Sequence, residues 1–258
     1  MDFKTQTIQN TLLSSCRNGN FLEVQAILQD PTVDVNERVK NIFGFTPLIA
    51  ACESGSLEIV ELLLKNKRAD INLGDNYSKT AFSCACNFGR VDIVRLMLGD
   101  EELDVNKDFN GWTPLMAACE NGNDEVVSLV LNDQRIQLNL RDEDGKTAFY
   151  HACDLGKIEV VKLLLEKEGV DVNQASSRGW TPLMTACFNG SIEIVRLILL
   201  EKGKKIDLSQ KEYKGKTAID LAREQKRTAI IDLLESFEKN PEKTTLQLRQ
   251  LGLFQIDF

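Results

Sequence analysis

The sequence has few features of a nucleic-acid-binding, exported or membrane protein. Basic residues are in the minority, with 31 Lys and Arg against 39 Asp and Glu, and a formal charge of -8 has the wrong sign for neutralising phosphates. The first ten residues contain no basic segment leading into an apolar run, and no apolar run approaches the roughly 18 residues that cross a bilayer. We therefore expect no nucleic-acid partner and no membrane insertion.

Histidine is also scarce, since His151 is the only one in the chain. With no nucleophile or acid placed irregularly beside it, a structural imidazole is a better interpretation than a general base. Two Gly-Lys-Thr triplets, from Gly145 and Gly215, resemble the end of a phosphate-binding loop. The first glycine of such a loop would fall at Leu140 and Gln210, so no phosphate site forms there. The sequence predicts no catalytic residues and no cofactor.

One segment recurs along most of the chain. GFTPLIAACESGSLEIVELLL, from Gly44, returns as GWTPLMAACENGNDEVVSLVL from Gly111, and a related segment without the threonine begins at Leu12. Threonines open the related segments at spacings of 34, 33, 34, 34 and 36 residues. These threonines are Thr46, Thr80, Thr113, Thr147, Thr181 and Thr217. Such a fixed period predicts a repeat architecture.

Each repeat has the pattern of two helices and a turn. Thr46 followed by Pro47 suits a helix start, small residues follow, and Gly55 suits the helix end. The second helix, as in 158–165, places its apolar residues on one face. An extended Asp-Val-Asn segment and a polar turn then lead to the next threonine.

On these segments the sequence resembles the ankyrin-repeat family, whose units of about 33 residues carry a Thr-Pro-Leu start and a motif histidine. The resemblance covers about residues 10 to 235 and implies an all-α solenoid of stacked ankyrin repeats. It also implies a protein-binding function without catalysis. The motif histidine is replaced throughout, so we expect its hydrogen bond at the helix start to be lost. Its replacements are Ile49, Ser83, Met116, Tyr150, Met184 and Asp220.

The repeats divide the chain into three regions. We expect a divergent capping repeat in residues 1–43, six repeats in residues 44–235, and a tail with a short helix in residues 236–258. The tail contains a helix start at 240–242, followed by Leu246, Leu248, Leu251, Leu253 and Phe254. It either covers the last repeat or binds another protein as a short linear motif.

Six of the seven cysteines share one position of the repeat, among the small residues of the first helix. They are Cys16, Cys52, Cys86, Cys119, Cys153 and Cys187. At about 10 Å between neighbouring helices, consecutive sulfurs are too far apart for a disulfide or a shared zinc ion. We therefore expect buried structural thiols, a reducing compartment and no metal. Cys84-x-Cys86 is the one pair that keeps a redox or metal role open.

The residue before each threonine alternates between an aromatic residue and lysine. We call this set the stripe residues: Phe45, Lys79, Trp112, Lys146, Trp180 and Lys216. They either cover a neighbouring finger or line the concave side as anchors for a partner, and we take them as the candidate partner-binding residues.

These observations favour a scaffold, adaptor or inhibitor that binds a protein on its finger and inner-helix surface. The alternative is the recognition subunit or domain of an enzyme complex, with catalysis elsewhere. The first 199 residues hold 29 acids and 19 bases, which suits a partner with a basic patch or serves only for solubility. We expect a monomer in the cytoplasm, with the nucleus as a further location.

Overall fold

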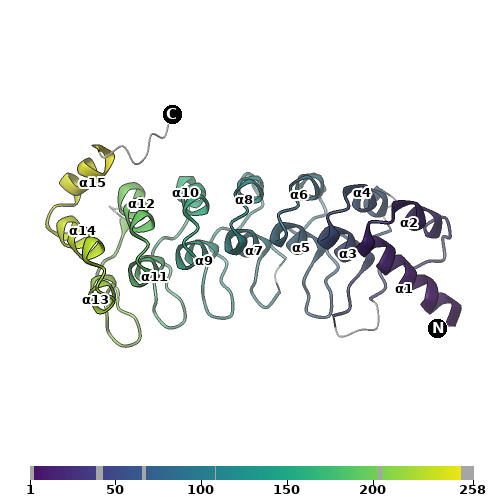
Figure 1. The fold of residues 1–258 in the computed structure, drawn as a ribbon, viewed down its shortest axis with the longest axis horizontal. Helices are drawn as coiled ribbons and strands as arrows, with labels where there is room; N and C mark the ends of the chain where they lie inside the picture. Colours follow the sequence, from purple (N-terminus) through teal and green to yellow (C-terminus); the bar gives the residue numbers. More distant parts are fainter. Residues whose placement is uncertain (1–2, 39–42, 66–67, 108, 203–204, 251–258) are drawn as a thin grey trace. The chain divides into compact units, whose positions relative to one another are not determined.

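The computed structural model describes residues 3–38, 43–65, 68–107, 109–202 and 205–250. The chain divides into two compact units, residues 1–137 and 138–258. In each unit, pairs of short helices alternate with extended fingers (Figure 1). The described residues contain no sheet, only isolated antiparallel bridges at Gly74 with Thr80 and at Phe109 with Trp112. The predicted all-α class of stacked helical repeats is confirmed, and no helix in these ranges has the length and apolar character to span a membrane.

The first unit has an inner row of helices beside the fingers and an outer row (Figure 1). The inner row contains α1 (Phe3–Asn18), α3 (Pro47–Ser54), α5 (Ala81–Asn87) and α7 (Pro114–Asn121). The outer row contains α2 (Phe21–Ile27), α4 (Leu57–Lys65), α6 (Val91–Leu98) and α8 (Asp124–Leu131). Each helix contacts the next helix of its own row, so every repeat is stabilised by its neighbours.

The second unit repeats this arrangement and adds a helix. Its inner row is α9 (Ala148–Asp154), α11 (Pro182–Asn189) and α13 (Ala218–Glu224). Its outer row is α10 (Ile158–Glu166), α12 (Ile192–Lys202) and α14 (Thr228–Lys239). The additional helix α15 (Pro241–Gln250) contacts both α12 and α14.

Helix α15 begins where the sequence places a helix start. Its Leu248 is buried, whereas Leu246 is 56% exposed. The other apolar residues named for the tail, Leu251, Leu253 and Phe254, lie outside the described residues. The three-region division at residues 43 and 235 stays a prediction.

Threonine starts every inner helix from α3 to α13. In each case the threonine Oγ1 accepts a hydrogen bond from the backbone N–H three residues later, at 3.1 to 3.4 Å. The expectation of a lost hydrogen bond at the motif-histidine position is wrong at Thr181 and at Thr217. The Thr181 backbone N–H donates to the Met184 sulfur at 3.4 Å. The Asp220 carboxylate accepts the Thr217 backbone N–H at 3.1 Å and its hydroxyl at 2.8 Å, so an aspartate now closes the helix start.

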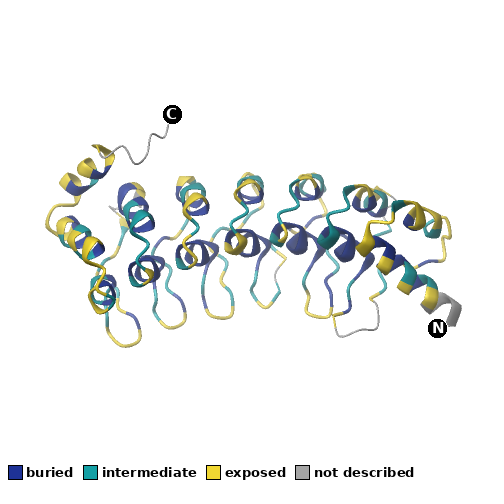
Figure 2. Ribbon diagram, viewed as in Figure 1, coloured by how far each residue is buried: buried dark blue, intermediate teal, exposed yellow. Residues whose placement is uncertain are grey.

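The inner helices are buried through their small residues. Ala50, Ala51 and Cys52 of α3 have no exposed surface, and the inner rows are the most continuously buried part of each unit (Figure 2). Small side chains allow neighbouring helices to approach closely, which explains why alanine and cysteine recur at these positions.

Arginines from the following repeat lie against the ends of two inner helices, Arg90 at α3 and Arg227 at α11. Gly55 ends α3 with φ of 84°, and a Cβ atom there would lie 2.9 Å from the Arg90 guanidinium carbon. Arg90 donates a hydrogen bond to the Glu53 carbonyl at 2.7 Å. Glycine is therefore required both by the left-handed backbone and by the approach of this arginine.

An asparagine ladder links consecutive repeats within each unit. In each rung, Nδ2 donates to a backbone carbonyl of the next repeat, and Oδ1 accepts a backbone N–H two residues beyond that carbonyl. For Asn106 these bonds reach the Arg135 carbonyl and the Gln137 N–H, both at 2.8 Å. The rungs are Asn36, Asn72, Asn106, Asn139 and Asn173.

Replacing Asn106 by alanine should lower the free energy of unfolding by about 2 kcal/mol, because two inter-repeat hydrogen bonds are lost. Asn106→Asp keeps the acceptor and should lose less. Urea denaturation measures both changes. Gln137→Ala is the control, since its side chain is exposed and its backbone N–H is retained. Equal urea midpoints for Asn106→Ala and the control would contradict a stabilising role for the ladder.

Candidate functional site

All six stripe residues are half-buried. Each stands where a finger enters an inner helix, immediately before the threonine that starts that helix. Five of these side chains have described contacts with residues of their own unit: Phe45, Lys79, Lys146, Trp180 and Lys216. The six residues therefore occupy equivalent positions in successive repeats, but their contacts differ from repeat to repeat.

In the first unit, two contacts of the stripe join a ring to a cation. The Arg17 guanidinium lies 5.1 Å from the Phe45 ring centre, and Arg17 is also 3.8 Å from the Glu53 carboxylate. The Lys79 ammonium lies 5.7 Å from the ring centre of Phe88, at the end of α5. Such cation–ring pairs are weakly stabilising at partly exposed sites.

In the second unit, two stripe residues contact the far end of their own inner helix. Trp180 packs edge-on against Phe188, with 5.4 Å between ring centres. Lys216 donates to the Glu224 carboxylate at 2.6 Å. These contacts favour a partly structural role for the stripe, because they position its side chains without hiding them.

The fingers of the first unit also carry an aromatic ladder that the sequence analysis missed. We define this ladder as Phe43, Phe45, Tyr77 and Phe109. Phe43 stacks on Phe45 at 5.6 Å, approaches Tyr77 at 6.3 Å, and Tyr77 meets Phe109 edge-on at 6.0 Å. Phe43 is 52% and Tyr77 45% exposed. Aromatic residues at turn positions, where polar residues are usual, were the available signal.

In the second unit, two fingers and helix α9 surround a pocket of about 340 Å³ that includes two stripe residues. Lys146 and Trp180 line it together with residues that the sequence analysis did not select. These are Asp144, Tyr150, Ser176, Ser177 and Arg178. The pocket combines positive charge, hydroxyl groups and an aromatic wall.

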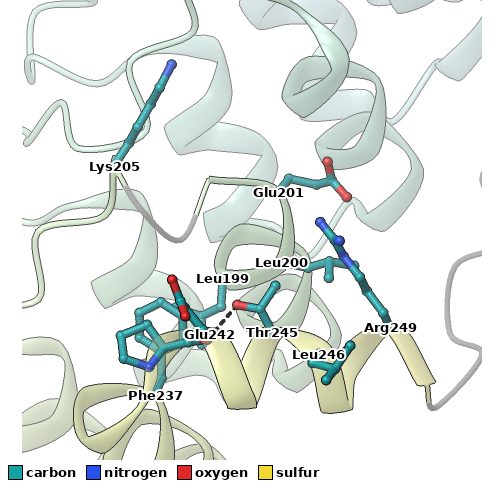
Figure 3. A pocket seen from close by; sticks show the side chains of 10 residues that line it. Leu199, Leu200, Glu201, Lys205, Phe237, Glu242, Thr245, Leu246 and Arg249 are labelled. Carbon is teal, nitrogen blue, oxygen red and sulfur yellow. Dashed lines mark hydrogen bonds between the residues drawn. The ribbon is translucent and has the colours of Figure 1, made fainter.

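A larger cavity of about 640 Å³ lies between α12, α14 and α15. Leu199, Leu200 and Phe237 contribute to its apolar lining, and Figure 3 shows the Arg249 and Glu201 side chains pointing toward one another. It contains no stripe residue, and its rim carries charges of both signs. It therefore offers little discrimination between ligands by charge.

The cysteines lie inside the inner rows, and all seven are buried. Burial raises the pKa of Cys16 to about 12, of Cys84 to about 11 and of Cys187 to about 12. For Cys52, Cys86 and Cys119, burial also raises the pKa well above its ordinary value. Protonated, inaccessible thiols are poor nucleophiles, so neither residue of Cys84-x-Cys86 is activated for redox chemistry.

His151 has a structural contact that accounts for its position. Its Nε2 lies 2.7 Å from the Asp142 carboxylate, and both side chains are nearly buried. The bond ties helix α9 to the finger before it. In the part of the chain that the structure describes, no three His, Cys, Asp or Glu side chains are grouped to hold a metal ion.

Stacked helix pairs, protruding fingers and buried small residues define a helical repeat solenoid. The chain belongs to the ankyrin-repeat family, because the family model for ankyrin repeats (3 copies) matches residues 12–108, 100–176 and 168–245. The predicted family is thus confirmed. Ankyrin repeats are protein–protein interaction modules and are generally non-catalytic.

Among solved structures, the chain is similar to the ankyrin repeat domain of Bcl-3, a member of the IkappaB protein family. The two share 25% sequence identity with a TM-score of 0.72, over 87% of this chain and 97% of the other. No curated protein sequence matches this chain.

Proposed function

We propose that this chain is a non-enzymatic scaffold, adaptor or inhibitor that binds a protein through its stripe residues and inner helices. The observation that carries the proposal is the aromatic ladder, with Phe43 at 52% and Tyr77 at 45% exposure beside the half-buried Phe45. Neighbouring exposed rings are typical of protein-binding surfaces, where aromatic residues are enriched. In the first unit, the stripe residues stand where the fingers enter the inner helices.

The charge distribution supports a partner with a basic patch. Residues 1–137 hold 20 acidic and 12 basic residues, whereas residues 138–258 hold 19 of each. The aromatic ladder therefore belongs to the acidic unit. Arg17 over Phe45 shows that a guanidinium fits against a ring of this surface. A basic partner segment gains both attraction from the acidic unit and contact with exposed rings.

We also propose that the chain is a monomer located in the cytoplasm, with the nucleus as a further location. The support for this location is the cysteine chemistry, because seven buried thiols suit a reducing compartment.

The direct test compares proteins captured from source lysate by the wild-type chain and by a Trp112→Ala/Trp180→Ala double variant. Mass spectrometry should identify a protein that the wild type captures and the double variant loses. Leu22→Ala is the matched control, because it removes a large exposed apolar side chain from the outer helix α2. Capture by all three chains to the same extent would contradict binding through the stripe.

With the captured protein in hand, Trp112→Ala should weaken binding by about 2 kcal/mol, near thirtyfold, with little change in the urea midpoint. The finger should survive this change, since the Trp112 backbone N–H and carbonyl bond to Phe109 at 2.8 and 3.1 Å. Titration calorimetry and urea denaturation on the same variant give both quantities. Unchanged affinity with lowered stability would assign Trp112 to packing.

A further inference from the structure

The pocket in the second unit is held open by bonds between its two fingers. Asp144 and Lys146 come from one finger, and Ser176 to Arg178 and Trp180 from the next. The Ser177 backbone N–H donates to the Asp144 carbonyl at 2.7 Å. The Ser176 hydroxyl oxygen accepts the Trp180 backbone N–H at 3.2 Å. Since these bonds join neighbouring fingers and fix the second one, the pocket exists before any ligand binds.

The pocket lining has a net charge of +1. Lys146 and Arg178 supply two positive charges and Asp144 one negative, with 3.8 Å between Lys146 Nζ and the Asp144 carboxylate. Among the described residues, the Arg178 guanidinium makes no hydrogen bond and no ion pair. Two further carboxylates stand near Tyr150 and already accept hydrogen bonds, Asp142 from His151 and Asp154 from Asn189. Among the residues that line the pocket, positive charge therefore exceeds negative charge by one.

The remaining groups complement a short anionic side chain. The Tyr150 ring lies 5.4 Å from the Lys146 ammonium and fixes its direction. Burial and the nearby Asp154 raise the pKa of Tyr150, so its hydroxyl remains protonated at neutral pH. Trp180, braced by Phe188, supplies an apolar wall against which methylene groups can lie.

We propose that this pocket binds one aspartate or glutamate side chain of a protein partner, with the carboxylate between Lys146 and Arg178. This rests on the proposed function as a protein-binding module. A single carboxylate neutralises the lining, whereas a phosphate of about two negative charges leaves an excess beside Asp144. Arg178 can bind a carboxylate with two parallel hydrogen bonds, which favours arginine at this position.

The probe is the tripeptide N-acetyl-Ala-Glu-Ala-amide, titrated into the isotope-labelled full chain and followed by amide NMR. We expect a dissociation constant in the millimolar range, with shifts at Lys146, Ser177 and Arg178 and at the Trp180 indole. The Gln counterpart of the peptide should bind at least about tenfold more weakly, because it lacks the charge.

Arg178→Glu should abolish the shifts. Lys214→Glu is the matched control, because Lys214 stands two residues before Lys216 as Arg178 stands two before Trp180, and it does not line the pocket. Dispersed spectra and unchanged urea midpoints establish that both variants fold. Arg178→Gln removes the positive charge without introducing a negative one. Binding of the Glu peptide that is weakened but not abolished in this variant would therefore support the proposal.

Four results would overturn the proposal: no shifts with the Glu peptide, equal binding of the Gln peptide, equal loss in both glutamate variants, or tighter binding of a phosphoserine peptide. The lysate experiment separates this from the proposed function. Suppose that the wild-type chain binds the Glu peptide, and that the Trp112→Ala/Trp180→Ala variant still captures every protein that the wild type captures. This result overturns only the stripe proposal. Stripe-dependent capture without peptide binding overturns only the pocket.

Discussion

The free energy of unfolding of this chain should fall by about 5 kcal/mol when the pH rises from about 8 to about 9.5. The cause is the set of buried thiols, whose pKa is raised in the folded protein for six of the seven cysteines. In the unfolded chain these thiols titrate at their ordinary value of 9.0. Urea denaturation in the presence of a phosphine reductant measures the effect.

The sign follows from which state releases protons. A thiol with a raised pKa stays protonated in the folded chain, so its stabilising contribution is complete below the unfolded pKa. Above that pKa only the unfolded state ionises, and stability is lost until the pH reaches the folded pKa, about 11 for Cys84 and about 12 for Cys16. Between pH 8 and pH 9.5 each thiol contributes a loss of about 0.8 kcal/mol, or about 5 kcal/mol for six.

A triple variant, Cys52→Ala with Cys86→Ala and Cys119→Ala, isolates the thiols from other titrating groups. It removes three of the six, so the fall between the same two pH values should be about half as large. Its stability at the lower pH is the reference, because removing three sulfurs also changes packing. A fall of the same size in wild type and triple variant would show that other groups cause the alkaline sensitivity.

Much of the fold could be predicted because its causes are local and repeated. Each threonine cap needs only a hydroxyl and an N–H three residues away. The buried cysteines share one repeat position, and that position requires only a small side chain. Asp220 was harder, since its helix-start bond to Thr217 uses a carboxylate where the family uses histidine. The same position is Met116 or Ile49 elsewhere, so the pattern alone did not single out a bonding residue.

The surface could not be read in the same way, because its contacts depend on which residues from separate turns come together. Trp180 and Lys216 occupy equivalent positions, yet one meets Phe188 and the other Glu224, eight residues further along in each case. Arg178 becomes a candidate binding residue only because the fold places it in one pocket with Lys146 from the previous finger. His151 looked isolated in the sequence, and only the fold brings Asp142 to it.

Removing residues 215–258 should lower the stability of the remaining chain by roughly 5 kcal/mol or more, or cause it to aggregate. The deletion takes away α13, which contacts α11, and α14 and α15, which contact α12. Leu197, Leu199 and Leu200 of α12 are buried in the intact chain. Leu199 and Leu200 share their cavity with Phe237 of α14, so the deletion removes part of their cover.

The matched control is a shorter deletion of residues 240–258, which removes α15 but keeps α13 and α14. It uncovers only the side of α12 and α14 that α15 contacts, so its loss of stability should be clearly smaller than that of the longer deletion. Urea midpoints and light scattering of all three chains decide the matter. If residues 1–214 remain monodisperse with the midpoint of the full chain, α13 is an appendage, and stacking on α11 contributes nothing to the second unit.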